Sequence, residues 1–439
     1  MRLSRIPLYF FLCVAITATA QHPARGAPPS SLAATSKATP KLIAAGIQAQ
    51  ARGKLKKFYA TRGFWPMWAA DGSIGKDADA LLGFLETADI DGLKPDAYDV
   101  DDLRAAIAEA RAGDPGAVAA AELALSQALG RYVSDLRRPA KSDMIYSDKA
   151  LKPGKPRVET ILRAASLPES LEDYVSSMGW MSPQYVRVRK LVAQAVDAGG
   201  SEEVVDRLRL NLERARLLPS AWVRHIVVDA SSGRLWYYQA GKQVGMMKVV
   251  VGTPQTPTPM LAGMLHYAIL NPYWNVPTDL AQRNIAPKVL GGRSLKSMGF
   301  EALSDWSASP QRLDPATIDW HAVAAGDQEL RLRQLPGRGN SMGRVKFLFP
   351  NDYGIYLHDT PDRHLFAKRD RHFSNGCIRL EDAATLGKWL LGKSIATASK
   401  DPEQTVALTA PVPVYLTYFT ATPTERGVGF LKDVYHRDE

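Results

Sequence analysis

The sequence predicts an α+β protein, with a mostly helical N-terminal domain followed by a β-rich domain that contains an inserted helical subdomain. Apolar residues recur every three or four positions over much of residues 51–217, which is the periodicity of amphipathic helices. From residue 218 onward, short runs alternate between apolar and polar residues, as strands do. Two domains agree with a chain of 439 residues that is 46% hydrophobic.

The first twenty residues have the layout of a secretory signal peptide. Arg2 and Arg5 form the basic end, residues 6–16 are apolar, and small residues up to Ala20 offer a cleavage site. Cys13 follows a leucine instead of a small residue, which argues against a lipoprotein anchor. The apolar run is short for a membrane span, although an uncleaved anchor stays open as an alternative. No later segment is predicted to cross a membrane.

Residues 21–50 are rich in Ala, Ser, Pro and Thr, a composition typical of a flexible linker. If the leader is removed, Cys377 is the single cysteine of the exported protein. An unpaired thiol is exposed to oxidation in such a compartment, so a catalytic role explains it better than packing does.

The net charge of +10 is moderate and its basic residues are dispersed. They could meet an anionic wall polymer, but they form no recognisable nucleic-acid module, and solvated charge explains them equally well. The sequence has no zinc-ligand spacing and no phosphate loop, so we expect neither a metal nor a cofactor. The acidic residues of the loop 89–96 lack EF-hand spacing and are predicted to form a surface turn.

The predicted elements follow in chain order. Residues 51–217 form the helical domain, and its last amphipathic helix, residues 204–217, connects it to the domain that follows. The second domain, residues 218–439, begins with four predicted strands, and two histidines within them, His225 and His266, are interpreted as structural. The predicted strands lie at residues 225–229, 234–238, 243–251 and 266–270.

The strand pattern breaks between residues 277 and 328, where two helical stretches surround a Gly-Gly pair. An excursion of this length within a β domain often forms a lid over a site. A strand at 345–349 then resumes the sheet, a helix follows at 383–391, and alternation returns at 412–420.

Two short stretches contain residues suited to covalent catalysis. His358 ends an alternating run, residues 353–357, that predicts a strand. Cys377 follows Asn375 and Gly376, a pair typical of tight turns, and precedes a predicted helix start. Unpaired N–H groups there would favour a thiolate and could stabilise an oxyanion. The alternative is a small buried cysteine and an ordinary, hydrogen-bonded histidine.

These stretches resemble the signature of the L,D-transpeptidases with a YkuD-type catalytic domain, namely a histidine followed by Ser/Thr-x-Gly-Cys-x-Arg. Further similarity, dense over residues 222–392, points to the large, periplasmic, YcbB-like branch of that family. The segments that carry this resemblance are residues 249–252, 256–257, 271–277, 343–350, 356–361 and 374–379.

The resemblance implies an α+β protein with a helical scaffold domain, a YkuD-type catalytic domain and a capping subdomain at 277–328. It implies a cysteine acyltransferase in which Cys377 is the nucleophile, His358 the general base and acid, and the Gly376 N–H an oxyanion donor. Asn375 stands where many relatives have a second histidine. No separate peptidoglycan-binding module is recognisable between residues 151 and 218.

Four more residues are expected to bind substrate in the implied site. Arg379 would hold a carboxylate or tie down the cysteine loop, and Tyr356 would line the site or pack. Ser374 is expected at the substrate or within the turn. These substrate-binding candidates are Arg379, Tyr356, Ser374 and Asn375.

The implied function is peptidoglycan L,D-transpeptidation in cell wall biogenesis and cell shape. A donor and an acceptor stem peptide would be joined by a 3–3 cross-link in the periplasm, and carbapenems would acylate the enzyme. Four alternatives stay open: an L,D-carboxypeptidase, transfer of a stem to an envelope protein amine, another cross-link position, and a non-catalytic wall-binding protein.

Overall fold

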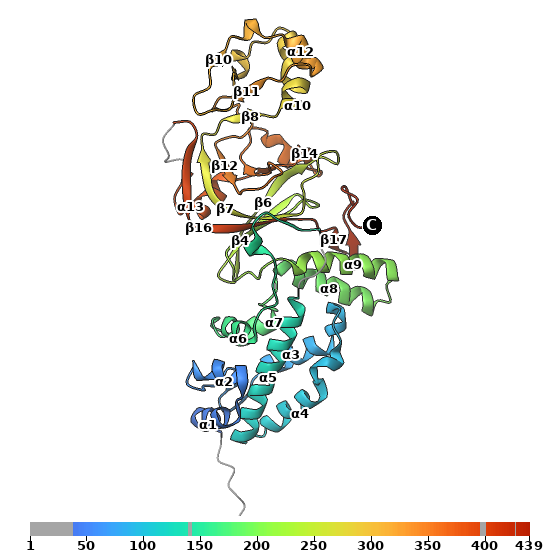
Figure 1. Cartoon of the computed structure of the whole chain (residues 1–439). Coiled ribbons are helices and arrows are strands. Elements are labelled where there is room, and N and C mark those ends of the chain that lie inside the picture. Colours follow the sequence, from blue (N-terminus) through green and yellow to red (C-terminus); the bar gives the residue numbers. More distant parts are fainter. Residues whose placement is uncertain (1–37, 139–142, 396–400, 426) are drawn as a thin grey trace, which may run out of the picture. The chain divides into compact units, whose positions relative to one another are not determined.

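The computed structural model describes residues 38–138, 143–395, 401–425 and 427–439 (Figure 1). The predicted signal peptide and residues 21–37 of the predicted linker lie outside the described residues. Within the described ranges, no helix is both long and apolar enough to pass through a bilayer.

The predicted linker over residues 21–50 is wrong in its last part, because helix α1 spans Pro40–Gln50. Thr39 caps this helix by accepting a hydrogen bond from the Leu42 N–H, and Pro40 occupies its first turn, where a missing N–H costs nothing. Ile43 and Ile47, four positions apart, are buried. The Ala- and Pro-rich composition therefore concealed an amphipathic helix.

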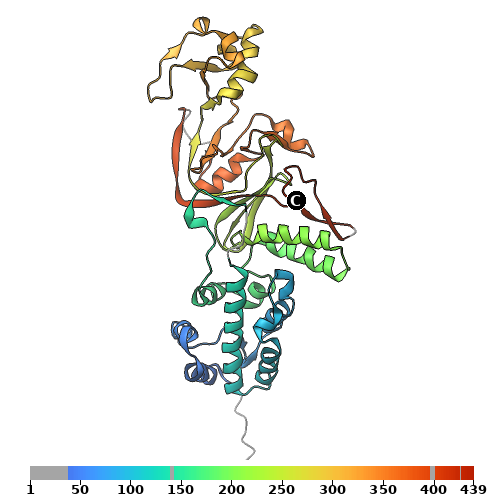
Figure 2. The same cartoon turned by 45° about the vertical axis from the view of Figure 1, so that its right-hand side comes forward.

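A helical N-terminal domain is confirmed. Its longest helix, α5 (Pro115–Leu136), starts behind an Asp114 cap and packs against α1, α4 and α6, which can be followed in Figure 2. The other helices are α2 (Gly53–Ala60), α3 (Asp77–Glu86), α4 (Val100–Ala110), α6 (Val158–Ala165), α7 (Leu171–Ser176), α8 (Pro183–Asp197) and α9 (Glu202–Arg216). Shorter elements are β1 (Ala69–Ala70), β2 (Ser73–Ile74), η1 (Ala88–Asp91), η2 (Pro95–Tyr98) and η3 (Lys149–Leu151).

The acidic loop 89–96 differs from the prediction of a surface turn, because Asp91 is only 1% exposed. Its carboxylate accepts hydrogen bonds from the hydroxyls of Tyr132 and Tyr185, both at 2.7 Å, and from Arg189 Nε at 2.9 Å. These three donors satisfy a charge whose burial would otherwise be costly.

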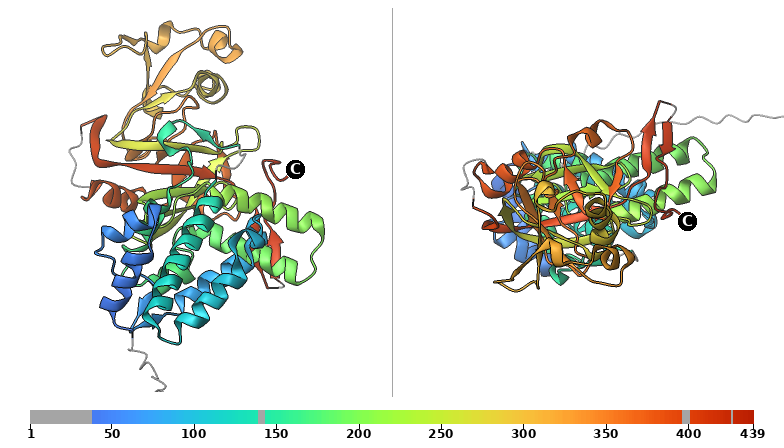
Figure 3. Two further views of the ribbon diagram at one scale, coloured as in Figure 1. Left: turned by 60° about the horizontal axis from the view of Figure 1, so that its bottom comes forward. Right: turned by 90° about the horizontal axis from the view of Figure 1, so that it is seen from above.

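The β-rich domain is built on a ten-stranded sheet. Its order is β12-β13-β15-β6-β5-β4-β16-β7-β3, and β14 pairs with β6 beside this path. Because β12 also pairs with β7, the sheet closes on itself. The long strands β7 and β16 pair side by side (Figure 3). The strands are β3 (Ile145–Tyr146), β4 (His225–Asp229), β5 (Arg234–Gln239), β6 (Lys242–Gly252), β7 (Leu261–Leu270), β12 (Val345–Leu348), β13 (Leu357–His358), β14 (His372–Ser374), β15 (Ile378–Leu380) and β16 (Gln404–Thr417).

The remaining elements of this domain follow the sheet strands. Helix α13 lies at Ala383–Leu391 and the turn η7 at Arg363–Ala367, while β17 (Ala421–Thr424) pairs with β18 (Gly427–Phe430) in a hairpin of its own. Strand β3 comes from the sequence range predicted to be purely scaffold, yet it pairs with β7 through Ile145 and Leu261.

The inserted subdomain is larger than the predicted range 277–328 and is not purely helical. It contains a four-stranded sheet, β10-β9-β11-β8, and a hydrophobic core of its own around Ala302, Val323 and Leu332. Strands of two to four residues alternate too briefly to be recognised in a sequence. The elements are β8 (Trp274–Val276), α10 (Thr278–Leu280), η4 (Ala281–Ile285), α11 (Ala286–Leu290), η5 (Lys296–Met298), β9 (Phe300–Leu303), β10 (Arg312–Leu313), η6 (Pro315–Thr317), α12 (Trp320–Ala325) and β11 (Arg331–Gln334).

Candidate active site

Strand register brings the two motif stretches together. β13 runs parallel to β15, with Leu357 opposite Ile378 and His358 opposite Arg379. Side chains alternate between the faces of a sheet, so Tyr356 and His358 share a face with Cys377 and Arg379. Four of the predicted site residues therefore lie on one small area of the sheet.

The predicted strand 353–357 is shorter than expected, because β13 begins only at Leu357. The Asn351 side chain organises the preceding residues into a turn by accepting from the N–H groups of Tyr353 and Ile355. Gly354 has a positive φ of 63°, and its carbonyl oxygen lies 3.4 Å from the Cys377 sulfur. The turn thus supplies a polar neighbour to the thiol.

The cysteine sits on a tight turn that needs glycine at position 376. Gly376 has a φ of 104°, and a Cβ there would lie 2.9 Å from Ile355 Cδ1. The Ser374 hydroxyl accepts from the Gly376 N–H at 3.2 Å and donates to the Cys377 carbonyl at 2.6 Å. Thr258 Oγ1 donates to the Gly376 carbonyl at 2.8 Å.

These bonds show what Gly376 and Ser374 do within the turn. The Gly376 N–H donates to the Ser374 hydroxyl. Ser374 is 2% exposed and its hydroxyl bridges the turn, as the alternative of a turn residue predicts. Both residues shape the turn that presents Cys377.

The thiol environment also differs from the prediction. Cys377 precedes strand β15, and helix α13 begins only at Ala383, so no helix N-terminus faces the sulfur. Burial raises the pKa of the Cys377 thiol to about 11, although hydrogen bonds from Tyr356 and the charge of Arg379 oppose this shift. Cys377 is therefore a neutral thiol at pH 7 instead of the predicted thiolate.

His358 is held as a neutral imidazole with one nitrogen available. Its Nδ1 lies 2.6 Å from the Asp359 carbonyl, which can only accept, so Nδ1 carries the proton and Nε2 keeps a lone pair. Burial lowers the pKa of His358 to about 3, and the positive charges of Arg379 and Lys346 lower it further. The unprotonated Nε2 is the ring nitrogen that can accept a proton.

Tyr356 lies next to Cys377, directly before strand β13. The Ile378 N–H donates to the Tyr356 carbonyl at 3.0 Å, Tyr356 lowers the pKa of the Cys377 thiol, and the Tyr356 ring meets His358 at a centroid distance of 5.8 Å. Burial, followed by the nearby Cys377, raises the pKa of the Tyr356 hydroxyl above its usual range. The hydroxyl therefore stays protonated and acts as a donor.

The remaining candidates are placed differently. Arg379 forms an ion pair at 2.8 Å with Asp362, in the segment that follows β13. Asn375 is exposed beside the thiol. His372, the histidine that precedes the Cys377 turn in the sequence, lies in strand β14 and contacts Asp370 and the Ala230 carbonyl.

Sequence reasoning missed three groups that hold the site residues in place. Thr258, Asp359 and Gly354 each contact a motif residue, and two of them act through backbone carbonyls, which no residue type reveals. Thr258 directly follows the Thr-Pro pair at 256–257, which carried part of the resemblance.

Comparison with known families assigns both domains. Residues 223–414 match the YkuD model, an L,D-transpeptidase catalytic domain, and residues 53–191 match a scaffold domain model. A Haemophilus influenzae protein named "Putative L,D-transpeptidase" is 28% identical over 401 residues, covering 88% of this chain and 78% of that protein.

Solved structures give looser matches. The catalytic domain of an Enterococcus faecium L,D-transpeptidase acylated by ertapenem is 14% identical, with 44% of this chain and 96% of that chain covered and a TM-score of 0.22. An L,D-transpeptidase from Mycobacterium smegmatis is 13% identical, covers 44% and 58%, and also has a TM-score of 0.22. Superpositions this loose add nothing to the family assignment.

Proposed function

We propose that this chain, which combines a scaffold domain at residues 53–191 with an L,D-transpeptidase catalytic domain at residues 223–414, forms 3–3 cross-links in peptidoglycan through a thioester on Cys377. The proposal rests on one observation. The strand pair β13 and β15 presents the Cys377 thiol, the Tyr356 hydroxyl and the imidazole of His358 on one face.

The first step is acylation from a neutral pair. The Cys377 sulfur attacks the carbonyl carbon of a donor amide while its proton passes to His358 Nε2. The tetrahedral intermediate then collapses, the C–N bond breaks, and His358 returns the proton to the departing amine. The products are a thioester and a free amine, and no cofactor takes part in this sequence.

Because the Gly376 N–H donates to Ser374 in this structure, we infer that further groups donate to the oxyanion. Tyr356 lies next to Cys377 and its hydroxyl stays protonated, so it can donate to an oxygen that forms beside the thiol. The backbone N–H of Cys377 is the second candidate by position. Loss of one such donor typically raises the barrier by about 3 kcal/mol.

The second step transfers the acyl group to an amine. An acceptor amine gives its proton to His358 Nε2 and attacks the thioester, which releases the Cys377 thiol with that proton. Water in place of the amine would give hydrolysis, so a cover that excludes water favours transfer. We assign this role to the cap, residues 274–334.

We infer the substrates from the match of residues 223–414 to an L,D-transpeptidase catalytic domain. The donor would be a tetrapeptide stem, cleaved between the L-centre of its third residue and the terminal D-alanine, and the acceptor would be the side-chain amine of a second stem. We place the reaction in the periplasm, after export through residues 1–20. We expect a carbapenem to acylate Cys377 through the same first step.

Mass spectrometry of the protein incubated with disaccharide-tetrapeptide tests the proposal. Wild type should produce a 3–3 dimer and free D-alanine, and Cys377→Ala should produce neither. His358→Gln should lose activity, whereas His364→Gln, at an exposed histidine of η7, should retain it.

The other outcomes separate the alternatives. Tripeptide and D-alanine without dimer would identify a carboxypeptidase, and a dimer only with an added envelope protein would identify a protein amine as acceptor. If neither the stem peptide nor a carbapenem modifies Cys377, the catalytic proposal is wrong and a non-catalytic wall-binding role remains.

A further inference from the structure

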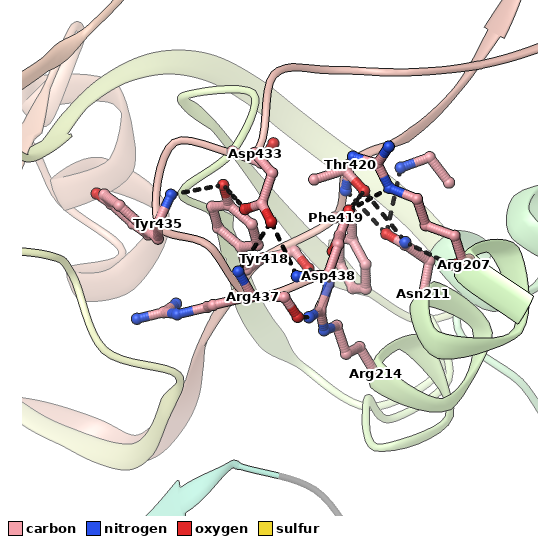
Figure 4. Close-up of polar contacts among 12 residues, drawn as sticks. Arg207, Asn211, Arg214, Tyr418, Phe419, Thr420, Asp433, Tyr435, Arg437 and Asp438 are labelled. Atoms are coloured by element: carbon pink, nitrogen blue, oxygen red, sulfur yellow. Dashed lines mark hydrogen bonds and ion pairs between the residues drawn. The ribbon is translucent and has the colours of Figure 1, made fainter. Parts of the chain in front are cut away.

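The segment 431–439 contacts helix α9 (Figure 4). It also contacts the loop 252–258, which lies against the nucleophile turn, residues 374–377. We propose that it is a positioning element for Cys377, in which Tyr435 and Arg437 hold the loop 252–258 and Asp438 fixes the segment to α9. This inference rests on the proposed function, because it concerns the geometry of the same thiol.

The first link runs from Tyr435 to the nucleophile turn. The Tyr435 hydroxyl donates to the Gly252 carbonyl at 2.7 Å and lies 3.5 Å from the Thr258 nitrogen. The Gly252 N–H donates to Thr258 Oγ1 at 2.9 Å, and that hydroxyl donates to the Gly376 carbonyl at 2.8 Å. Tyr435 is therefore connected to the turn through two residues.

The Arg437 side chain also contacts the loop 252–258. Its Nη2 donates to the Thr258 carbonyl at 3.0 Å. Within the loop, the Thr253 N–H and Thr256 Oγ1 donate to the Ser374 carbonyl at 2.9 and 3.2 Å. Loop 252–258 thus contacts the turn at both Ser374 and Gly376, and the 431–439 segment holds the loop on its other side.

The Tyr435 ring is itself fixed by packing. It stacks on Tyr418 with a centroid distance of 5.1 Å and an interplanar angle of 23°, and it meets the edge of His372 at 5.4 Å. His372 lies two residues before Ser374 in β14, so this contact gives a second connection to the turn.

The segment has a preformed shape of its own. Asp433 accepts from the Tyr418 hydroxyl at 2.8 Å and from the N–H groups of Arg437 and Asp438, both at 2.9 Å. The Tyr435 N–H donates to the Tyr418 hydroxyl at 3.1 Å. These bonds fold the segment into a compact turn whose aromatic and basic side chains face the loop.

Asp438 fixes the segment to the helical domain. Its carboxylate accepts from Arg207 Nε and Arg214 Nη1 of α9, each at 2.7 Å, and from the Thr420 hydroxyl. The Asp438 side chain is 5% exposed, as is that of Arg214. A buried carboxylate with paired arginines holds one geometry, which is what a positioning contact requires.

Two variants test the proposal with little change of shape. Tyr435→Phe keeps the ring stack and removes the hydroxyl, while Asp438→Asn keeps the side-chain volume and removes the charge. Tyr267→Phe, in strand β7, removes a tyrosine hydroxyl elsewhere in the same sheet and serves as the control.

Three readouts are taken well below the melting temperature of each variant. They are the single-turnover rate of Cys377 acylation by a carbapenem, the concentration that half-saturates this rate, and hydrogen exchange of peptides covering residues 374–377. Both variants should slow acylation about tenfold and leave the half-saturating carbapenem concentration unchanged. A small displacement of the reacting atoms lowers the rate of the chemical step more than it weakens binding. Both should speed exchange at 374–377, and the control should change neither.

The proposal is overturned if Tyr435→Phe and Asp438→Asn lower the melting temperature while acylation and exchange at 374–377 match wild type. If wild type itself is not acylated, the proposed function fails. Exchange at 374–377 then still decides the positioning claim, because that readout needs no reaction.

Discussion

The reactive residues pair a thiol with a pKa of about 11 and an imidazole with a pKa of about 3. Cysteine nucleophiles that rest as a thiolate need a cationic or strongly donating environment. Here burial outweighs the effect of Tyr356, and the thiol rests neutral. In the proposed mechanism, the proton would therefore leave Cys377 for His358 during the attack itself. A resting thiol of this kind is protected from oxidants until a substrate arrives.

The raised pKa of Cys377 predicts its alkylation profile. The rate of reaction with iodoacetamide should rise about tenfold per pH unit from pH 7 toward pH 10, without a plateau below pH 10, because only the thiolate reacts. Peptide mapping by mass spectrometry separates Cys377 from Cys13. A plateau reached near pH 7 would instead reveal a resting thiolate.

The lowered pKa of His358 predicts acid sensitivity of the fold. In the folded protein His358 stays neutral down to about pH 3, whereas in the unfolded chain it binds a proton near pH 6.5. The free energy of unfolding therefore decreases as the pH falls from 6.5 to 3. The loss is about 1.4 kcal/mol per pH unit. Urea unfolding should show that the stability of His358→Gln falls less steeply with decreasing pH than that of wild type. Part of the pH dependence that remains should come from buried His225, whose pKa is about 4.

Tyr356→Phe should slow carbapenem acylation by roughly a hundredfold, because it removes an oxyanion donor. It should also raise the pKa of Cys377 further, since the lost hydrogen bond favoured the thiolate. Tyr353→Phe is the matched control, because that side chain is 53% exposed in the same loop. Equal rates for the two variants would remove Tyr356 from the mechanism.

At the scale of elements, the nucleophile turn depends on bonds from segments distant in the chain. Loop 252–258 contacts it through Thr258, and the Ser374 hydroxyl closes it from within. The turn has no helix beneath it, since β15 follows directly. Its geometry is therefore set by hydrogen bonds and by glycine.

Gly376→Ala should cost more stability than Gly392→Ala, although both positions have a positive φ, of 104° and 70°. Each alanine carries a backbone cost of about 1 kcal/mol. Only the first also collides with Ile355, because nothing lies within 4 Å of a Cβ at Gly392. Guanidinium unfolding measures both, and Gly376→Ala alone should abolish acylation of Cys377.

The sequence allowed accurate prediction of elements whose pattern is long or sharply bounded. The strand at 225–229 and the helix at 383–391 match β4 and α13 residue for residue. Short strands of the cap were missed because two to four residues show no period. The contacts of Tyr435 were missed because Gly252 lies 183 positions away in the chain.

At the scale of the whole molecule, the cap has a hydrophobic core separate from the main one. The chain enters it and leaves it at adjacent points, since Trp274 pairs with Gln334 across β8 and β11. The cap can therefore be removed without separating the ends that the sheet needs.

Replacing residues 274–334 by a short Gly-Ser linker should leave a folded protein with a cooperative thermal transition. Cys377 should still react with iodoacetamide, while cross-link formation falls and hydrolysis of the donor becomes the main reaction, because water reaches the thioester. Product analysis by mass spectrometry measures the ratio. An unchanged ratio of dimer to hydrolysed tripeptide would show that the cap does not exclude water.

Strand β3 has a consequence for how this architecture can be inherited. Ile145 and Tyr146, from the helical half of the sequence, complete the same edge of β7 that β12 occupies further along. A gene fragment encoding only residues 218–439 would leave part of that edge unpaired, a surface that invites aggregation. If recombination moves this catalytic domain to another gene, the new protein must therefore supply a segment that covers this edge. Otherwise the helical domain and the catalytic domain must be moved together.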